Sequence, residues 1–174
     1  SETLRRASMV TGARVELAGA LTLGLNGDQM SELGLMSEAG AVAFSDGRKP
    51  MMNAALLRRS MDYARPFGLP VMIRPGDVDL EGGGVMHEGA VSTQVGLRGI
   101  PSAAEEIGVG RAIALARLTQ AKVHLSSVTT AGAVKLIRAA KADGVSITAA
   151  APARHLLLTD QAIDDSVYST AMRM

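Results

Sequence analysis

Short apolar runs alternate along the chain with longer segments in which apolar residues recur at helical spacing. The expected strands lie at residues 14–21, 41–45, 69–73, 123–128 and 145–149. The expected helices occupy residues 2–10, 28–38, 53–65, 101–119 and 130–143, and Thr159 begins a last short one. Strands that alternate with helices in this way are typical of repeated βαβ units. The pattern predicts an α/β fold of one domain, residues 1–174, with about five parallel strands and flanking helices.

Capping residues support several of these boundaries. Asp28, Asn53 and Thr130 stand at expected helix starts, where a side-chain oxygen can accept a backbone N–H. Gly68 and Gly144 stand at expected helix ends, where glycine readily adopts the left-handed conformation. The glycine-rich stretch 74–100 follows the third strand and is expected to be a long loop.

Composition narrows the possible functions. The 174 residues are 47% hydrophobic and carry a net charge of +1, so the chain can bury a core and has no basic footprint for nucleic acid. Aromatic residues make up only 2%, which leaves little surface for base stacking. The absence of cysteine excludes disulfides and thiolate metal sites. No apolar run is long enough to span a bilayer, and we expect a cytoplasmic protein without membrane partners.

Three polar residues end expected strands and are the candidates for chemistry. They are Asp46, Arg74 and Ser127, and in α/β folds the loops after strand C-termini carry the functional groups. Strand alternation places Phe44 with Asp46, and Leu125 with Ser127, on faces that would point into a barrel. The three histidines are far apart and form neither an HxH nor an HExxH arrangement, so they are a poor metal signal.

Several segments resemble those of a known family in their amino-acid sequence and in their order along the chain. They are Gly19-Ala20-Leu21-Thr22 with Gly24-Leu25, residues 41–47 (AVAFSDG), residues 83–89 (GGVMHEG), Gly99-Ile100-Pro101 with residues 104–107 (AEEI), and residues 155–160 (HLLLTD). The chain resembles dihydroorotases of the bacterial multifunctional-complex type, in the amidohydrolase superfamily. The resemblance implies a metal-dependent TIM (β/α)8 barrel, of which this chain supplies only strands three to seven. We therefore expect it to be a fragment of a longer protein.

The resemblance also assigns roles to single positions. Asp46 matches the metal-bridging aspartate of the family, whereas Arg74 and Ser127 stand where the family has histidine ligands. Zinc needs lone pairs aimed at one point, and arginine offers none while serine is a poor ligand. The family uses zinc, but we expect no cofactor for this chain. We also expect Arg74 to occupy the place of the metal and to neutralise Asp46.

Three further positions depart from the family pattern. Gly76 stands where a glutamate is common, and Ala150 and Arg154 replace a glutamate and a histidine that usually follow the seventh strand.

Three functions remain open from the sequence. The first is an inactive dihydroorotase homologue that acts as a structural partner of aspartate transcarbamoylase in pyrimidine biosynthesis. The second is an active zinc-dependent dihydroorotase that converts carbamoyl aspartate to dihydroorotate with ligands outside this chain. The third is a small-molecule binder whose anionic ligand meets Arg74 and Arg154. Unpaired sheet edges at both ends of a barrel slice also predict self-association into a homo-oligomer.

Overall fold

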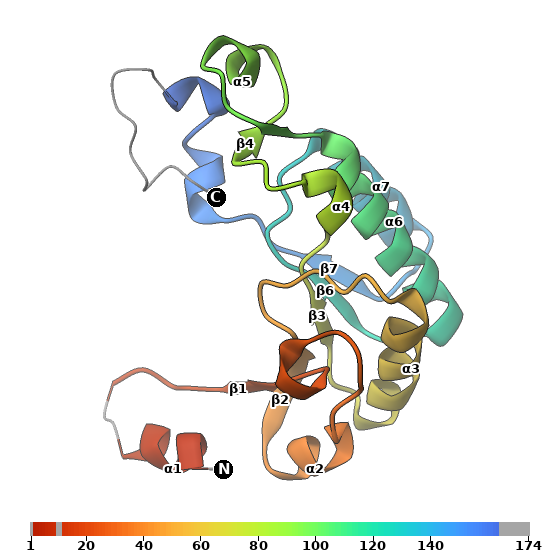
Figure 1. Cartoon of the computed structure of the whole chain (residues 1–174). Helices are drawn as coiled ribbons and strands as arrows, with labels where there is room; N and C mark the ends of the chain where they lie inside the picture. The colour runs from red at the N-terminus through yellow and green to blue at the C-terminus, as the bar shows by residue number, and fades with distance from the viewer. Residues whose placement is uncertain (1, 10–11, 164–174) are drawn as a thin grey trace.

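The main sheet confirms the predicted fold class. The computed structural model of the protein describes residues 2–9 and 12–163. Five parallel strands lie in the order β1-β2-β3-β6-β7, and the sheet does not close on itself (Figure 1). The strands are β1 (Leu17–Gly19), β2 (Ala41–Ser45), β3 (Val71–Ile73), β6 (Val123–Leu125) and β7 (Ile147–Ala149). The architecture is a partial (β/α)8 barrel.

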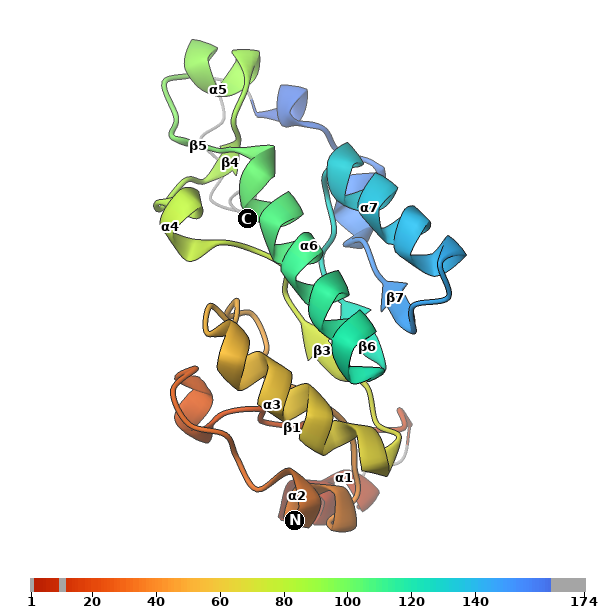
Figure 2. The same ribbon diagram turned by 90° about the vertical axis from the view of Figure 1, so that its right-hand side faces the viewer.

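Helices cover one side of this sheet only. The long helices α3 (Ala54–Ala64), α6 (Ser102–Thr119) and α7 (Ala131–Ala142) stand side by side on that side (Figures 1 and 2). The short helix α2 (Leu33–Glu38) packs near β2, and α1 (Glu2–Ser8) lies at the N-terminal end. The other side of the sheet is concave and faces the open middle of the C-shaped molecule.

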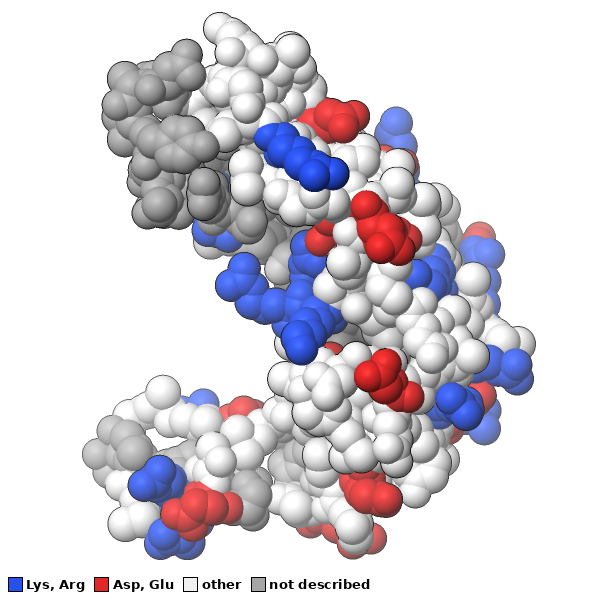
Figure 3. Space-filling model, viewed as in Figure 1, with Lys and Arg blue, Asp and Glu red and all other residues white. Residues whose placement is uncertain are grey.

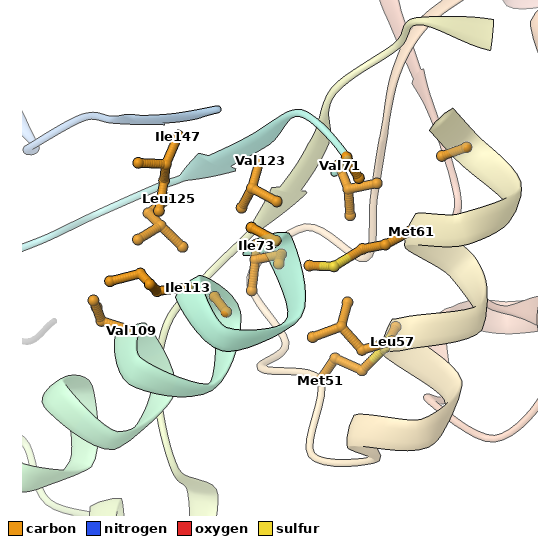
Figure 4. Close-up of a cluster of buried hydrophobic side chains, with 14 of the residues drawn as sticks. Met51, Leu57, Met61, Val71, Ile73, Val109, Ile113, Val123, Leu125 and Ile147 are labelled. Atoms are coloured by element: carbon orange, nitrogen blue, oxygen red, sulfur yellow. The ribbon is translucent and has the colours of Figure 1, made fainter. Parts of the chain in front are cut away.

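The core lies between the sheet and the long helices. Phe44, Val71, Val123 and Ile147 are partners in successive strands, and all four are buried. They pack on apolar residues of α3 and α6, which include Leu57, Met61, Val109 and Ile113 (Figure 4). Each large side chain buried in this way stabilises the fold by roughly 1.5–3 kcal/mol. The sheet is therefore held to its helices by the face that carries Phe44.

Two of the predicted helix starts are confirmed in atomic detail. The Asn53 side chain accepts the backbone N–H of Leu56 at 3.0 Å, and α3 begins at the next residue, Ala54. The Thr130 hydroxyl accepts the backbone N–H of Ala133 at 3.3 Å, and α7 begins at Ala131. These bonds satisfy donors that have no partner within the helix.

The predicted start at Asp28 is wrong. Helix α2 begins only at Leu33, and Glu32 precedes it without a side-chain cap. Residues 28–31 instead belong to a loop in which Thr22 and Met30 form an isolated antiparallel bridge. That pairing supplies the loop backbone with partners and so prevents an earlier helix start.

The stretch between β3 and α6 is also more ordered than predicted. It contains α4 (Val78–Glu81), β4 (Met86–His87), α5 (Ala90–Gln94) and β5 (Gly99–Ile100), and β4 pairs with β5 in a second small sheet. Four 3-10 turns complete the described chain: η1 (Leu23–Leu25), η2 (Arg65–Phe67), η3 (Ala153–Leu156) and η4 (Asp160–Ala162). Elements this short carry too little apolar periodicity to be seen in the sequence.

Candidate functional site

Asp46 follows β2 and is held by the loop that follows β1. Its side chain is 6% exposed, and one oxygen accepts the backbone N–H of Thr22 at 2.9 Å. The other oxygen accepts the Thr22 hydroxyl at 2.5 Å, and that hydroxyl accepts the backbone N–H of Gly27 at 2.9 Å. A buried carboxylate needs such donors to replace water. Asp46 therefore ties two adjacent strand ends together.

Arg74 follows β3 and pairs with a different carboxylate from the one expected. Its Nη1 lies 3.0 Å from Oε1 of Glu81, at the end of α4, and 3.3 Å from Oε2. The two side chains are 30% and 19% exposed. Arg74 and Asp46 are both described residues, and the structure records no ion pair between them. The expected pair is wrong because Thr22 already holds both oxygens of Asp46 and α4 offers Glu81 instead.

Ser127 lies past the end of β6 in an unusual backbone conformation. Its φ is 59°, in the left-handed region, and the residue is exposed. The strand face predicted for it is wrong, because Leu125 is buried against the helices rather than turned toward the concave side. His124 lies on that concave side, where its Nδ1 and the Thr148 hydroxyl are 2.9 Å apart. The left-handed residue ends the strand alternation, so the position of Ser127 cannot be extrapolated from Leu125.

Arg154 and His155 lie in η3, beyond β7. Arg154 is exposed and has no ion pair among the residues that the structure describes. Burial lowers the pKa of His155, the charge of Arg154 lowers it further, and Glu105 opposes the shift. Among the described residues, the buried Nε2 atom of His155 has no hydrogen-bond partner. The proposal that Arg74 and Arg154 bind an anion remains a prediction, and Arg74 already has a carboxylate partner.

Charge on the concave side is predominantly positive. Figure 3 shows Lys and Arg side chains gathered in the hollow, over the region where the parallel strands end. Arg111 of α6 joins the loops after β2 and β3, because its Nη2 donates to the backbone carbonyl of Gly76 at 3.0 Å and lies 3.8 Å from the sulfur of Met52.

The residues at the strand ends do not fit a zinc ion. A cationic guanidinium stands after β3, and the carboxylate after β2 uses both oxygens to bind Thr22. Across residues 2–9 and 12–163, no three histidine, aspartate or glutamate side chains are grouped so that they could hold a metal. A zinc site requires several such donors around one point.

Two residues of this region were not found from the sequence. Thr22 lies within the quoted segment Gly19-Ala20-Leu21-Thr22, but a threonine after a strand carries no sign that it binds a distant carboxylate. Glu81 lies seven residues after Arg74, and only the turn of α4 brings the two together.

Solved structures with a similar fold place the chain in a class. An L-hydantoinase (dihydropyrimidinase) from Arthrobacter aurescens superposes with a TM-score of 0.67 at 17% identity, over 91% of this chain and 37% of its own. A D-hydantoinase gives a TM-score of 0.64 at 21% identity, over 92% of this chain and 37% of its own. At such identities the likeness concerns the fold alone. The chain thus has the fold of part of an α/β barrel, as these structures do.

Sequence comparison gives the family. The model of the dihydro-orotase-like family matches residues 3–133, and the chain belongs to this family. A dihydroorotase from Anaeromyxobacter sp. (strain K) is 47% identical over 171 residues, which are 98% of this chain and 40% of that protein. A dihydroorotase from Pelotomaculum thermopropionicum is 52% identical over 145 residues, 83% of this chain and 34% of that protein. The chain thus spans about two fifths or less of the length of these relatives.

Within the part of the chain that the structure describes, no helix combines the length and the apolar character that a bilayer span requires.

Proposed function

We propose that the protein to which this chain belongs is a dihydroorotase-like protein without catalytic activity. It would act in pyrimidine biosynthesis as a structural partner of aspartate transcarbamoylase. The observation that carries the proposal is the Arg74–Glu81 ion pair at the end of β3. By family resemblance this position holds a histidine ligand of zinc, and a guanidinium cannot take over that role.

The surroundings of Arg74 support the same conclusion. Asp46, the carboxylate that matches the family's metal ligand, is buried and accepts two hydrogen bonds from Thr22. Ser127, at the second histidine position, offers only a hydroxyl. A binuclear site that lacks the histidine ligands at positions 74 and 127 cannot activate water for ring opening or closure. What remains is a barrel surface that can position another subunit.

Metal content and turnover test the loss of catalysis. The full-length protein is purified without chelator, its zinc is quantified by mass spectrometry, and dihydroorotase turnover is followed in both directions. The Anaeromyxobacter dihydroorotase, measured in parallel, is the positive control. We expect far less than one zinc per chain and no turnover above background. Stoichiometric zinc together with turnover would overturn the proposal.

The partnership needs a separate test. Full-length protein and the aspartate transcarbamoylase of the same organism are co-expressed and analysed by size-exclusion chromatography with light scattering. A stable complex of defined stoichiometry, with transcarbamoylase activity that depends on this protein, is the expected result. Independent elution and unchanged transcarbamoylase activity would refute the structural role.

A second candidate function has one observation in its favour. The Anaeromyxobacter and Pelotomaculum relatives are named dihydroorotase, at 47% and 52% identity. An active zinc-dependent enzyme, with its remaining ligands in parts of the protein outside this chain, would fit those names. The zinc and turnover measurements decide between the two candidates.

A further inference from the structure

We propose that Arg74, Gly76 and Glu81 form one interdependent unit, the β3–α4 latch, which closes position 74 to any other role. The proposal rests on the inactive function proposed above for its biological meaning, but its geometry stands alone. The guanidinium of Arg74 reaches from the end of β3 to the carboxylate of Glu81 on α4 at 3.0 Å. Helix α4 has only four residues, and it also contacts α6 and β5.

Gly76 provides the space in which the ion pair lies. A Cβ atom at this position would overlap Oε1 of Glu81 and come within 3.1 Å of Nη1 of Arg74. It would also lie 3.3 Å from the Pro50 ring. The φ angle of Gly76 is not in the left-handed region, so other residues could adopt its backbone conformation. Glycine at this position thus leaves the space in which the Glu81 carboxylate meets Arg74, and a Cβ atom would push that carboxylate aside.

The turn cannot retreat to make room for a side chain at position 76. Helix α6 contacts it from the other side at Gly108, where a Cβ atom would overlap the backbone nitrogen of Gly76. Arg111, one turn further along α6, donates to the backbone carbonyl of Gly76 at 3.0 Å. The backbone at Gly76 is therefore fixed by α6, and any added atom must displace the Arg74–Glu81 pair.

The latch has a consequence for the metal position. An Arg74→His change would remove the cation but leave the Glu81 carboxylate, 19% exposed, above Gly76 without its partner. A glutamate at position 76, where the resemblance places one, would require the same space. Substitutions at positions 74, 76 and 81 are therefore expected to depend on one another, because the three residues share one ion pair and the space around it.

A double-mutant cycle in the full-length protein tests this interdependence. Gly76→Ala, Glu81→Ala and the double variant are compared by thermal unfolding. We expect Gly76→Ala to lower Tm in the wild-type background by about 2 °C or less, because a given loss of stability shifts Tm less in a larger protein. In the Glu81→Ala background the same change should have a much smaller effect, because the overlapping carboxylate is gone.

Gly110→Ala is the matched control for this cycle. Gly110 lies in α6, which packs on the turn that contains Gly76, and a Cβ atom at Gly110 would meet nothing within 4 Å, so Tm should not fall. If Gly76→Ala alone does not fold, recovery of folding by Glu81→Ala is the supporting outcome. An equal loss of Tm in both backgrounds, or no loss in the wild type, would overturn the latch.

Failure of the latch and failure of the proposed function give different results. The double-mutant cycle measures only melting temperatures. If the Tm losses of Gly76→Ala and Glu81→Ala simply add while the protein is free of zinc and inactive, the latch is refuted and the proposed function is not. Conversely, zinc and turnover in the wild-type protein would refute the proposed function and leave the cycle to be judged on its own data.

Discussion

Among single residues, Asp46 shows how a carboxylate can be buried without a cation. Its two oxygens accept an N–H and an O–H from one neighbour, Thr22, so the charge is stabilised by two neutral donors. Thr22 is fully buried and also accepts the backbone N–H of Gly27. Loss of either partner would leave buried polar atoms without hydrogen bonds, which is more costly than the bond itself is worth.

Asp46→Ala is therefore expected to destabilise the protein. The change leaves two donors of Thr22 buried and unpaired, which should lower the free energy of unfolding by about 2–3 kcal/mol. Urea denaturation of the full-length protein measures the loss. Thr22→Ser keeps both donors and is the control, while Thr22→Val should reproduce part of the loss. If Asp46→Ala lowered the free energy of unfolding no more than Thr22→Ser does, the stabilising role of Asp46 would be contradicted.

His155 gives the protein a pH dependence whose sign follows from its environment. Burial lowers the pKa of His155 in the folded state, so the unfolded chain binds more protons between the two pKa values. The contribution of His155 to stability is therefore fully present above its ordinary pKa of about 6.5 and is lost as pH falls through the lower, folded value. Thermal melts at several pH values should show this loss, and His155→Gln should reduce it.

Among elements, Glu105 connects the two long helices α6 and α7. It lies in the first turn of α6, and its carboxylate accepts the backbone N–H groups of Thr129 and Thr130, each at 2.9 Å. Both threonine hydroxyls donate to the same carboxylate. A negative charge at the start of α7 also interacts favourably with the helix dipole. One side chain thus joins the end of the β6 loop, α6 and α7.

Glu105→Ala should loosen this junction. Hydrogen bonds to a charged group are worth about 1.5–3 kcal/mol, so a loss of that order in the free energy of unfolding is expected. Hydrogen exchange should then rise first at the start of α7. Glu38→Ala, at an exposed glutamate without such bonds, is the control and should change little. Unchanged protection of the start of α7 would show that Glu105 does not hold it.

The elements that could be predicted are those whose sequence carries its own signals. Strand β2 has the predicted bounds, and the inward residues of α3 follow from helical spacing and the Asn53 cap. In α6 the buried stripe consists mainly of small residues such as Ala112 and Ala116, while the larger Leu118 is exposed. Apolar character alone cannot separate the two sides of such a helix.

The site was less predictable than the fold, for a physical reason. That Asp46, Arg74 and Ser127 follow strand ends could be read from the sequence. Their partners could not, because hydrogen bonds and ion pairs depend on loop paths that no periodicity describes. Arg74 was matched to Asp46 because the family resemblance puts both at one metal site, whereas the unpredicted helix α4 supplies Glu81.

At the scale of the whole molecule, the main feature is the open five-stranded sheet. Strands β1 and β7 lie at the ends of its strand order, and within residues 2–9 and 12–163 no further strand pairs with their outer edges. Such edges pair readily with other chains. In β6, His124 is partly exposed, whereas its neighbour Leu125 is buried against the helices.

The 174-residue chain, produced alone, should therefore associate. Light scattering after size-exclusion chromatography is expected to show a mass that rises with protein concentration. Lysine substitutions at the outer edge of β7, such as Thr148→Lys, should reduce the association, since charges on an edge oppose pairing. A monodisperse monomer at all concentrations would contradict this expectation.

The left-handed backbone at Ser127 has a consequence for redesign. Glycine enters this conformation most readily. Of the other residue types, histidine, asparagine and aspartate enter it more readily than most. An imidazole could thus be grafted at position 127 with the main chain left as it is, whereas position 74 would first have to be freed from Glu81. A redesign that introduces metal ligands should therefore substitute position 127, after β6, first and position 74, after β3, last.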